Sequence, residues 1–228
     1  KIIMNGLLKS SIGRKIAMAL SALFLMFFLL QHFAINITSI LPDNGATFNS
    51  LSHFMGTNPV VQFVMQPILI FGVVFHFVMG FVLEIKNRKA QKIKYYKDNG
   101  AANSSWMSRN MIWSGLAILG FVALHFVDFW FPELNTKFIQ GDWSGLHEGE
   151  LRYFHELQEK FHNPARVVAY IIAFTFLAMH LLHGFNSAFQ SMGANNKYTK
   201  GLKTFSKVYS IGIPVGFIII ALFHHFNH

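Results

Sequence analysis

The sequence predicts an all-α membrane protein, a bundle of five transmembrane helices with an amphipathic helix on its outer side. Apolar residues make up 53% of the 228 residues, charged residues make up 13%, and phenylalanine alone supplies 26. This composition is too apolar for a soluble domain of this length. Five apolar stretches of about 20 residues are each long enough to cross a hydrocarbon layer of roughly 30 Å. They cover residues 16–40, 60–85, 111–131, 165–190 and 207–226, and we expect one domain over residues 1–228.

The first apolar stretch follows Arg14 and Lys15 and in this respect is similar to a secretory signal peptide. It is longer than the apolar region of such a peptide, and it lacks a small-residue cleavage site. We therefore expect it to be retained as the first span.

Basic residues are distributed unequally between the two sides of the expected bundle. If successive spans alternate in direction, fifteen of the nineteen Lys and Arg residues fall on one side, within residues 1–15, 86–109 and 197–207. This is the positive-inside pattern, so we expect a cytoplasmic N-terminus and a C-terminus on the outer side. The net charge of +9 is then gathered on an inner face that suits anionic lipid or a docked soluble protein, and we expect no nucleic-acid partner.

The segments between the spans contain one further predicted helix. Residues 41–59 and 86–110 are expected to be short outer and inner connections, whereas the outer segment 132–164 is longer. Large apolar residues recur in that segment at helical spacing among polar ones, which predicts an amphipathic helix at the membrane interface. These residues are Leu151, Phe154, Leu157 and Phe161, and Pro164 suits the start of the next helix.

Four of the five apolar stretches contain a histidine deep in their interior: His32, His76, His125 and His180. An ionisable residue inside a membrane span is costly unless it is neutral or bound to a partner, so each is a candidate functional residue. At about 1.5 Å per residue, His32 and His125 lie roughly 25 Å from the inner ends of their spans, near the outer side. His76 and His180 lie on spans of opposite direction, in the inner half. The depths pair His32 with His125 and His76 with His180.

Two imidazoles on opposite faces of one porphyrin make a six-coordinate haem, and facing helices of a bundle can supply them. The two pairs therefore predict two haem b groups, one above the other across the membrane. The sequence has no cysteine, which excludes covalent c-type attachment, thiolate-bound iron–sulfur clusters and disulfides. Because bis-imidazole ligation leaves no open position on the iron, such haems would carry electrons rather than bind oxygen.

The surroundings of these histidines permit more than one interpretation. Gly80 lies one turn from His76 and Gly184 one turn from His180, and each glycine either makes room for a porphyrin or lets two helices approach closely. His183 lies one turn from His180 and could replace it as ligand or contact a haem propionate. We expect the other histidines to be solvated or to lie at the outer C-terminal end: His53, His147, His155, His162, His224, His225 and His228.

The fourth span carries the most specific motif of the sequence, His180-Leu-Leu-His183-Gly-Phe-Asn-Ser-Ala-Phe-Gln-Ser-Met-Gly193. It resembles the fourth-helix motif of the cytochrome b subunit of succinate dehydrogenase and fumarate reductase, in the branch with a single five-helix polypeptide and two haems. The resemblance covers essentially the whole chain. Further similar segments are Gln31–Asn36 in the first span, His76–Gly80 with Asn87-Arg88 in the second, and Ser108-Arg109 before the third.

This resemblance implies the membrane anchor and di-haem subunit of a succinate:quinone oxidoreductase in a bacterial inner membrane. In that family the first and third helices hold the outer haem and the second and fourth hold the inner one, and His180 rather than His183 is the ligand. The implied partners are an iron–sulfur subunit on the basic inner face and a flavoprotein that carries the dicarboxylate site. This chain would be the quinone-reactive subunit of the enzyme, with menaquinone as the expected substrate.

Quinone reduction takes up two protons, so a polar group beside a haem is needed. Asp128 lies one turn past His125 and is either a proton relay or an ordinary interfacial carboxylate. Weaker candidates are Asn36 and His53 for the quinone site, and Arg14 and Arg109 for propionate or lipid contacts on the inner side.

Three alternatives stay open at this point. One is the di-haem cytochrome b anchor of a hydrogenase or formate dehydrogenase, which also spans the membrane with His-ligated haems. The second is a transporter that binds a divalent metal through histidine, although its histidines would be expected at one depth beside carboxylates. The third is a structural anchor without cofactor, which would be colourless.

Overall fold

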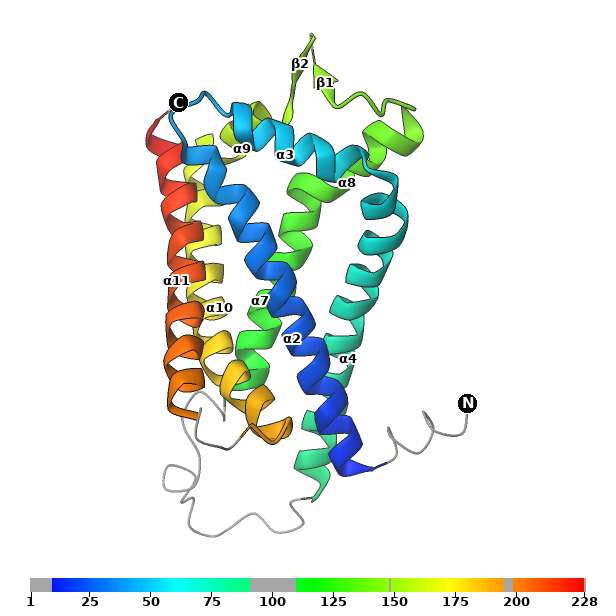
Figure 1. The fold of residues 1–228 in the computed structure, drawn as a ribbon, viewed down its shortest axis with the longest axis vertical. Helices are drawn as coiled ribbons and strands as arrows, with labels where there is room; N and C mark the ends of the chain where they lie inside the picture. Colours follow the sequence, from blue (N-terminus) through cyan, green and yellow to red (C-terminus); the bar gives the residue numbers. More distant parts are fainter. Residues whose placement is uncertain (1–9, 91–109, 148, 195–198, 228) are drawn as a thin grey trace.

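The computed structural model describes residues 10–90, 110–147, 149–194 and 199–227, which form an antiparallel bundle of long helices (Figure 1). Five helical stretches are long and apolar enough to cross a membrane: Ser11–Ile40, Val61–Lys89, Met111–Ile139, Pro164–Ser191 and Thr199–Phe226. The all-α class and the five spans predicted from the sequence are confirmed, and the protein is a multi-pass helical membrane protein.

The chain passes up and down the bundle in order. We call the end that carries the C-terminus the upper end and the opposite end, near the start of the first helix, the lower end (Figure 1). The long helices are α2 (Ser11–Asn36), α4 (Gln66–Ala90), α7 (Met111–His125), α10 (Pro164–Ser191) and α11 (Thr199–Phe226). α2, α7 and α11 ascend, whereas α4 and α10 descend.

α10 lies at the centre of the packing and contacts α11, α2 and α7, while α4 packs mainly on α2. Hydrocarbon solvates outward-facing apolar side chains as well as the core does, so close packing rather than burial from water holds such a bundle together. One close approach joins α2 to α11, where a Cβ on Gly216 would lie 2.3 Å from the ring of Phe33. α4 and α7 bury little of their surface and leave most of their apolar side chains facing outward.

A cap of short elements covers the upper end (Figure 1). It consists of α3 (Ala46–Thr57), α9 (Tyr153–His162) and an antiparallel hairpin of β1 (Leu146–His147) and β2 (Glu150–Leu151). α8 (Phe131–Leu134) belongs to the upper part of the third span. The amphipathic helix expected between residues 132 and 164 is confirmed as α9, which buries Leu157 and Phe161. Pro164 is the first residue of α10, as expected, and Asn163 caps that helix by accepting from the Ala165 N–H at 2.9 Å.

α3 corrects the expectation that residues 41–59 are only a connection. Asp43 fixes the turn before this helix, because its carboxylate accepts from the Thr47 N–H at 3.0 Å and from the Thr47 hydroxyl at 2.5 Å. These hydrogen bonds lower the pKa of Asp43. Gly45 follows with a φ of +78°, a conformation that favours glycine, and the ring of Phe154 from α9 lies against it.

Three π-helical segments interrupt the upper ends of the second and third spans: η2 (Val61–Met65), η3 (Phe126–Trp130) and η4 (Asn135–Ile139). Pro67 follows η2 and Pro132 follows η3, each after one intervening residue. A proline lacks the N–H and its ring clashes with the carbonyl four residues earlier, so a wider turn in front of it relieves the conflict. The third span thereby continues to Ile139, eight residues beyond its predicted end.

Candidate functional site

The bundle brings the four span histidines together as two pairs. The ring centres of His32 on α2 and His125 on α7 are 5.7 Å apart, with an angle of 82° between the rings. The ring centres of His76 on α4 and His180 on α10 are 6.4 Å apart, with an angle of 71°. These are the two pairs that the depth of each histidine along its span predicts. We call His32 and His125 the upper pair and His76 and His180 the lower pair.

The spacing of each pair suits a metal held between two imidazoles. With metal–nitrogen bonds of about 2 Å, two trans imidazoles place their ring centres roughly 6 Å apart. Both observed separations, 5.7 Å and 6.4 Å, are close to this value. The donor set of each pair, two neutral imidazoles on facing helices, is the one that a six-coordinate haem iron takes.

Each histidine of the lower pair contacts a serine hydroxyl, and nothing in the sequence alone indicates these two serines. Ser21 of α2 lies 3.1 Å from His76 Nδ1, and Ser114 of α7 lies 3.2 Å from His180 Nδ1. Both serines are buried in the bundle. Each histidine of the lower pair therefore has one ring nitrogen bound to a neighbouring helix and keeps Nε2 for another partner.

Aromatic rings rather than hydroxyls surround the upper pair. Phe28 stacks on His32 with ring centres 5.5 Å apart, and Phe121 stacks on His125 at 5.9 Å. Among the described residues, the Nδ1 atom of His32 has only the side-chain amide of Asn36 near it, at 3.5 Å. That amide donates to the His32 carbonyl at 2.8 Å. Within the described part of the chain, His125 Nδ1 is buried without a hydrogen bond. The two pairs thus differ in what holds their second nitrogens.

Gly80 and Gly184, one turn from the two histidines of the lower pair, each face the end of a methionine side chain. A Cβ on Gly80 would meet the terminal methyl of Met18 at 3.7 Å, and one on Gly184 would meet that of Met111 at 3.6 Å. Methionine is flexible and readily repacks, so the space beside both glycines can adapt to a bound group. His183 is half-buried one turn along α10, and the ring next to His76 is that of His180.

Asp128 lies on η3 and joins α7 to α10. Its carboxylate, 1% exposed, forms an ion pair with Arg166 at 3.0 Å and accepts from the Tyr170 hydroxyl at 2.9 Å. Tyr170 in turn contacts His125, with ring centres 6.4 Å apart. Asp128 is therefore linked to the upper pair through Tyr170, but both of its oxygens already have partners.

The weaker candidates lie apart from one another. His53 is on α3 in the cap, where its nearest described ring is that of Tyr153 with centres 6.4 Å apart. Arg14 is half-buried in the first turn of α2, at the lower end of the bundle. Arg109 lies outside the described residues, as does much of the basic segment before it.

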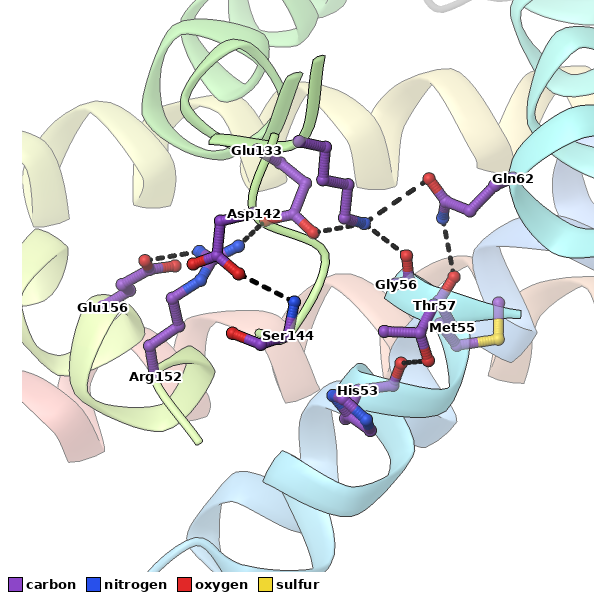
Figure 2. A network of polar contacts seen from close by, with 11 residues as sticks. His53, Met55, Gly56, Thr57, Gln62, Glu133, Asp142, Ser144, Arg152 and Glu156 are labelled. Carbon is purple, nitrogen blue, oxygen red and sulfur yellow. Dashed lines mark hydrogen bonds and ion pairs between the residues drawn. The ribbon is translucent and has the colours of Figure 1, made fainter. Parts of the chain in front are cut away.

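A buried ion network joins the cap to the spans, and sequence reasoning missed it (Figure 2). Lys137 on η4 is almost completely buried, with Glu133 at 2.5 Å, Gln62 at 3.5 Å and the carbonyl of Gly56 as partners. Glu133 also pairs with Arg152, which binds Glu156 at 2.5 Å. Burial opposes the charge on Arg152, but its bonds to both glutamates outweigh this and raise its pKa.

The same network affects Tyr153, next to Arg152. Burial, reinforced by the negative charge of Glu133, raises the pKa of Tyr153 to about 12. Its hydroxyl is buried and has no hydrogen bond among the described residues. The pairs Glu133–Lys137 and Arg152–Glu156 are each four residues apart, a spacing that the sequence shows. Their union into one cluster is not visible in the sequence, because the ion pair that joins them links residues 19 positions apart.

A groove of about 700 Å³ lies on the surface between α4 and the upper part of the third span. Its walls are mainly apolar, and three polar side chains lie among them, Gln62, Gln66 and Trp130. The Trp130 indole N–H is buried without a hydrogen bond in the described structure. Gln62 on η2, Trp130 on η3 and Phe138 on η4 all contribute, so each π-helical segment lines the groove. Such segments are frequent at functional sites.

His224 lies near the C-terminal end of the fifth span, but sequence reasoning did not find its partner. It is fully buried at the upper end of α11, where Nε2 lies 2.9 Å from the Ser39 hydroxyl. The pairing follows from the close approach of α11 to α2, which short-range sequence patterns do not encode.

Comparison of the chain with protein-family models, with curated proteins and with solved structures found no match.

Proposed function

We propose that this protein is a di-haem cytochrome b that anchors a respiratory complex and exchanges electrons between a soluble partner and membrane quinone. The observation that carries the proposal is the presence of two histidine pairs, at two levels of the bundle, with ring separations of 5.7 Å and 6.4 Å. A single pair would be compatible with packing between helices. Two pairs at metal-bridging distance, each from facing spans, favour two bound metal centres.

The pairs would each hold one haem b, whose iron supplies one-electron transfer when bound. His32 and His125 would hold the haem at the upper level, and His76 and His180 would hold the haem at the lower level. Stacked rings, Phe28 on His32 and Phe121 on His125, would fix the imidazoles of the upper pair. Burial and hydrogen bonds to the second ring nitrogens would set the two potentials.

The groove between α4 and the third span supports access for quinone from the lipid. A ligand with an isoprenoid tail and a carbonyl-bearing ring needs an apolar channel with a few hydrogen-bond donors. Phe71 and Val74 supply exposed apolar walls, and Trp130 supplies a buried indole donor near the level of the upper pair. Asp128 and Tyr170 lie beside His125, where protons for quinone chemistry would be needed.

The charge distribution supports a soluble partner at the lower end. The described basic residues at that end lie on the ends of α2, α4 and α11: Arg14, Lys15, Lys86, Arg88, Lys89, Lys200, Lys203 and Lys207. By the positive-inside rule we infer that this end is cytoplasmic, and the resemblance implies a bacterial inner membrane. The resemblance in the fourth span makes succinate:quinone oxidoreductase the preferred complex, with an iron–sulfur subunit and a flavoprotein as partners.

A reduced-minus-oxidised optical spectrum of the purified protein, with haem quantified per chain, tests the proposal. We expect two b-type haems with low-spin bands. His76→Ala and His180→Ala should each remove the same haem and leave the other, whereas His32→Ala and His125→Ala should remove the second one. His183→Ala is the matched control, because it lies one turn from His180 and should retain both haems.

A colourless protein would contradict the proposal and favour the metal transporter or the plain anchor. Loss of different haems from His76→Ala and His180→Ala would reject the pairing. If both haems are present but the iron–sulfur subunit and the flavoprotein of a succinate dehydrogenase or fumarate reductase do not copurify, the anchor of a hydrogenase or formate dehydrogenase becomes the better assignment.

A further inference from the structure

The two serines beside the lower pair bond in the same way, and their geometry assigns their protons. Ser21 Oγ donates to the Met18 carbonyl at 2.8 Å, and Ser114 Oγ donates to the Met111 carbonyl at 2.9 Å. A serine hydroxyl has one proton to donate and two lone pairs that accept. Since each proton is used within its own helix, each oxygen is left to accept from the histidine.

It follows that both histidines of the lower pair donate from Nδ1. His76 Nδ1–H points to Ser21 at 3.1 Å, and His180 Nδ1–H points to Ser114 at 3.2 Å. In a neutral imidazole the other nitrogen then carries the lone pair. Both Nε2 atoms are therefore in the form that binds a metal, before any metal arrives.

The sequence repeats this arrangement in two spans. Ser21 precedes His32 by eleven residues on α2, and Ser114 precedes His125 by eleven residues on α7. Eleven residues are about three helical turns, so in each helix the serine and the histidine lie on one face, roughly 16 Å apart. α2 and α7 thus each supply a ligand to the upper pair and a hydroxyl to the lower pair.

We propose that Ser21 and Ser114 are positioning residues that fix the tautomer and orientation of the lower histidine pair, so that the lower haem site is built differently from the upper one. The inference rests on the proposed function, because it concerns haem at the lower pair. Hydrogen bonds from the second nitrogen make an imidazole ligand more basic and favour the oxidised iron. The upper pair lacks hydroxyl partners of this kind within the described residues.

The test compares Ser21→Ala and Ser114→Ala with the wild type in the purified protein by redox titration and electron paramagnetic resonance. Both substitutions should raise the midpoint potential of the lower haem, shift its resonance and leave the upper haem unchanged. Each tenfold loss of preference for the oxidised iron corresponds to about 59 mV in a one-electron couple. The lower haem is recognised as the one that His76→Ala removes.

Ser39→Ala is the matched control. Ser39 is also buried in the first span, donates to a carbonyl three residues earlier at 2.7 Å and contacts a histidine, but that histidine is His224. This variant should leave both haem signals unchanged. Ser21→Thr and Ser114→Thr keep the hydroxyl and should retain the wild-type potential of the lower haem.

Several outcomes would overturn the inference. Unchanged lower-haem signals in both alanine variants would do so, as would equal shifts of the two haems. If an alanine variant does not fold, the corresponding threonine variant provides the test. A lower haem with the wild-type potential in that variant supports the hydrogen bond. A lower haem that is missing or has a shifted potential shows that the volume of the side chain, and not its hydroxyl, is what matters. Absence of haem from the wild type would instead refute the proposed function.

Discussion

At the scale of single residues, several buried polar groups of this membrane protein are bound to specific partners. Asp128 shows the effect most clearly, because both carboxylate oxygens are bound, one by Arg166 and one by Tyr170. A buried carboxylate without partners would be very costly, and with them it can join two spans. Its proximity to His125 through Tyr170 also keeps it a candidate for proton transfer.

Asp128→Asn is expected to destabilise the bundle by about 1–3 kcal/mol, because it removes the charge partner of the partly exposed Arg166. The loss should be seen as a lower thermal unfolding temperature in detergent. Asp142→Asn is the control, since that carboxylate lies in an exposed turn and accepts from the Ser144 N–H at 2.8 Å. If Asp128→Asn instead lowers quinone turnover while stability is unchanged and both haems are present, Asp128 transfers protons and does not stabilise the contact between the spans.

The four histidines and their pairing could be predicted from the sequence, whereas the residues that hydrogen-bond them could not, for a physical reason. The depth of His32, His76, His125 and His180 depends only on residue count along straight helices, so the pairs could be predicted. Which side chain stands behind each ring depends on how the helices are rotated and how closely they approach. The roles of Ser21 and Ser114 were therefore visible only once α2, α4, α7 and α10 were placed.

At the scale of helices, close approaches depend on small residues at particular positions. Gly216 is such a position, since the Phe33 ring of α2 lies where its Cβ would stand. Gly212 is one turn earlier on α11, and nothing lies within 4 Å of its Cβ position. Gly216 therefore permits the packing of α11 against α2, whereas Gly212 affects only the intrinsic stability of α11.

Gly216→Ala is expected to destabilise the protein by about 1–3 kcal/mol, because the added methyl forces α2 and α11 apart. Gly212→Ala should leave stability unchanged or raise it by up to about 1 kcal/mol, through better helix propensity. Thermal unfolding of both variants in the same detergent provides the comparison. Equal unfolding temperatures for the two variants would contradict the close approach.

The spans were predictable from length and apolarity, but the elements at their upper ends were not. α9 follows from the period of Leu157 and Phe161. α3 was missed because its start depends on a turn at Asp43 and a positive φ at Gly45 rather than on apolar periodicity. The three π-helical segments were missed as well, since hydropathy carries no information on the number of residues per turn.

At the scale of the whole molecule, the cap and the bundle form one structure joined by the Lys137 network. Lys137 belongs to the third span, Gly56 to α3, and Arg152 to the turn before α9. The ion pairs, together with the hydrogen bond from Lys137 to the Gly56 carbonyl, therefore connect three parts of the chain that are distant in sequence. Since the same lysine contacts Gln62, which lines the groove, the network also fixes one wall of the proposed quinone route.

Lys137→Met is expected to destabilise the cap by about 3 kcal/mol, because it leaves the half-buried Glu133 with Arg152 alone and the Gly56 carbonyl without its donor. Limited proteolysis should then cut between residues 140 and 153 earlier than in the wild type. Lys160→Met is the control, because Lys160 lies on α9 and forms no ion pair with any described residue. Identical cleavage of the two variants would show that the network does not hold the cap.

The division of the histidines among the helices has a consequence for biogenesis. The upper pair uses α2 and α7, and the lower pair uses α4 and α10. During synthesis the upper pair is complete once the third span has entered the membrane, whereas the lower pair must wait for the fourth. A nascent chain arrested after three spans would therefore contain one complete histidine pair, and insertion of the two proposed haems would have a built-in order.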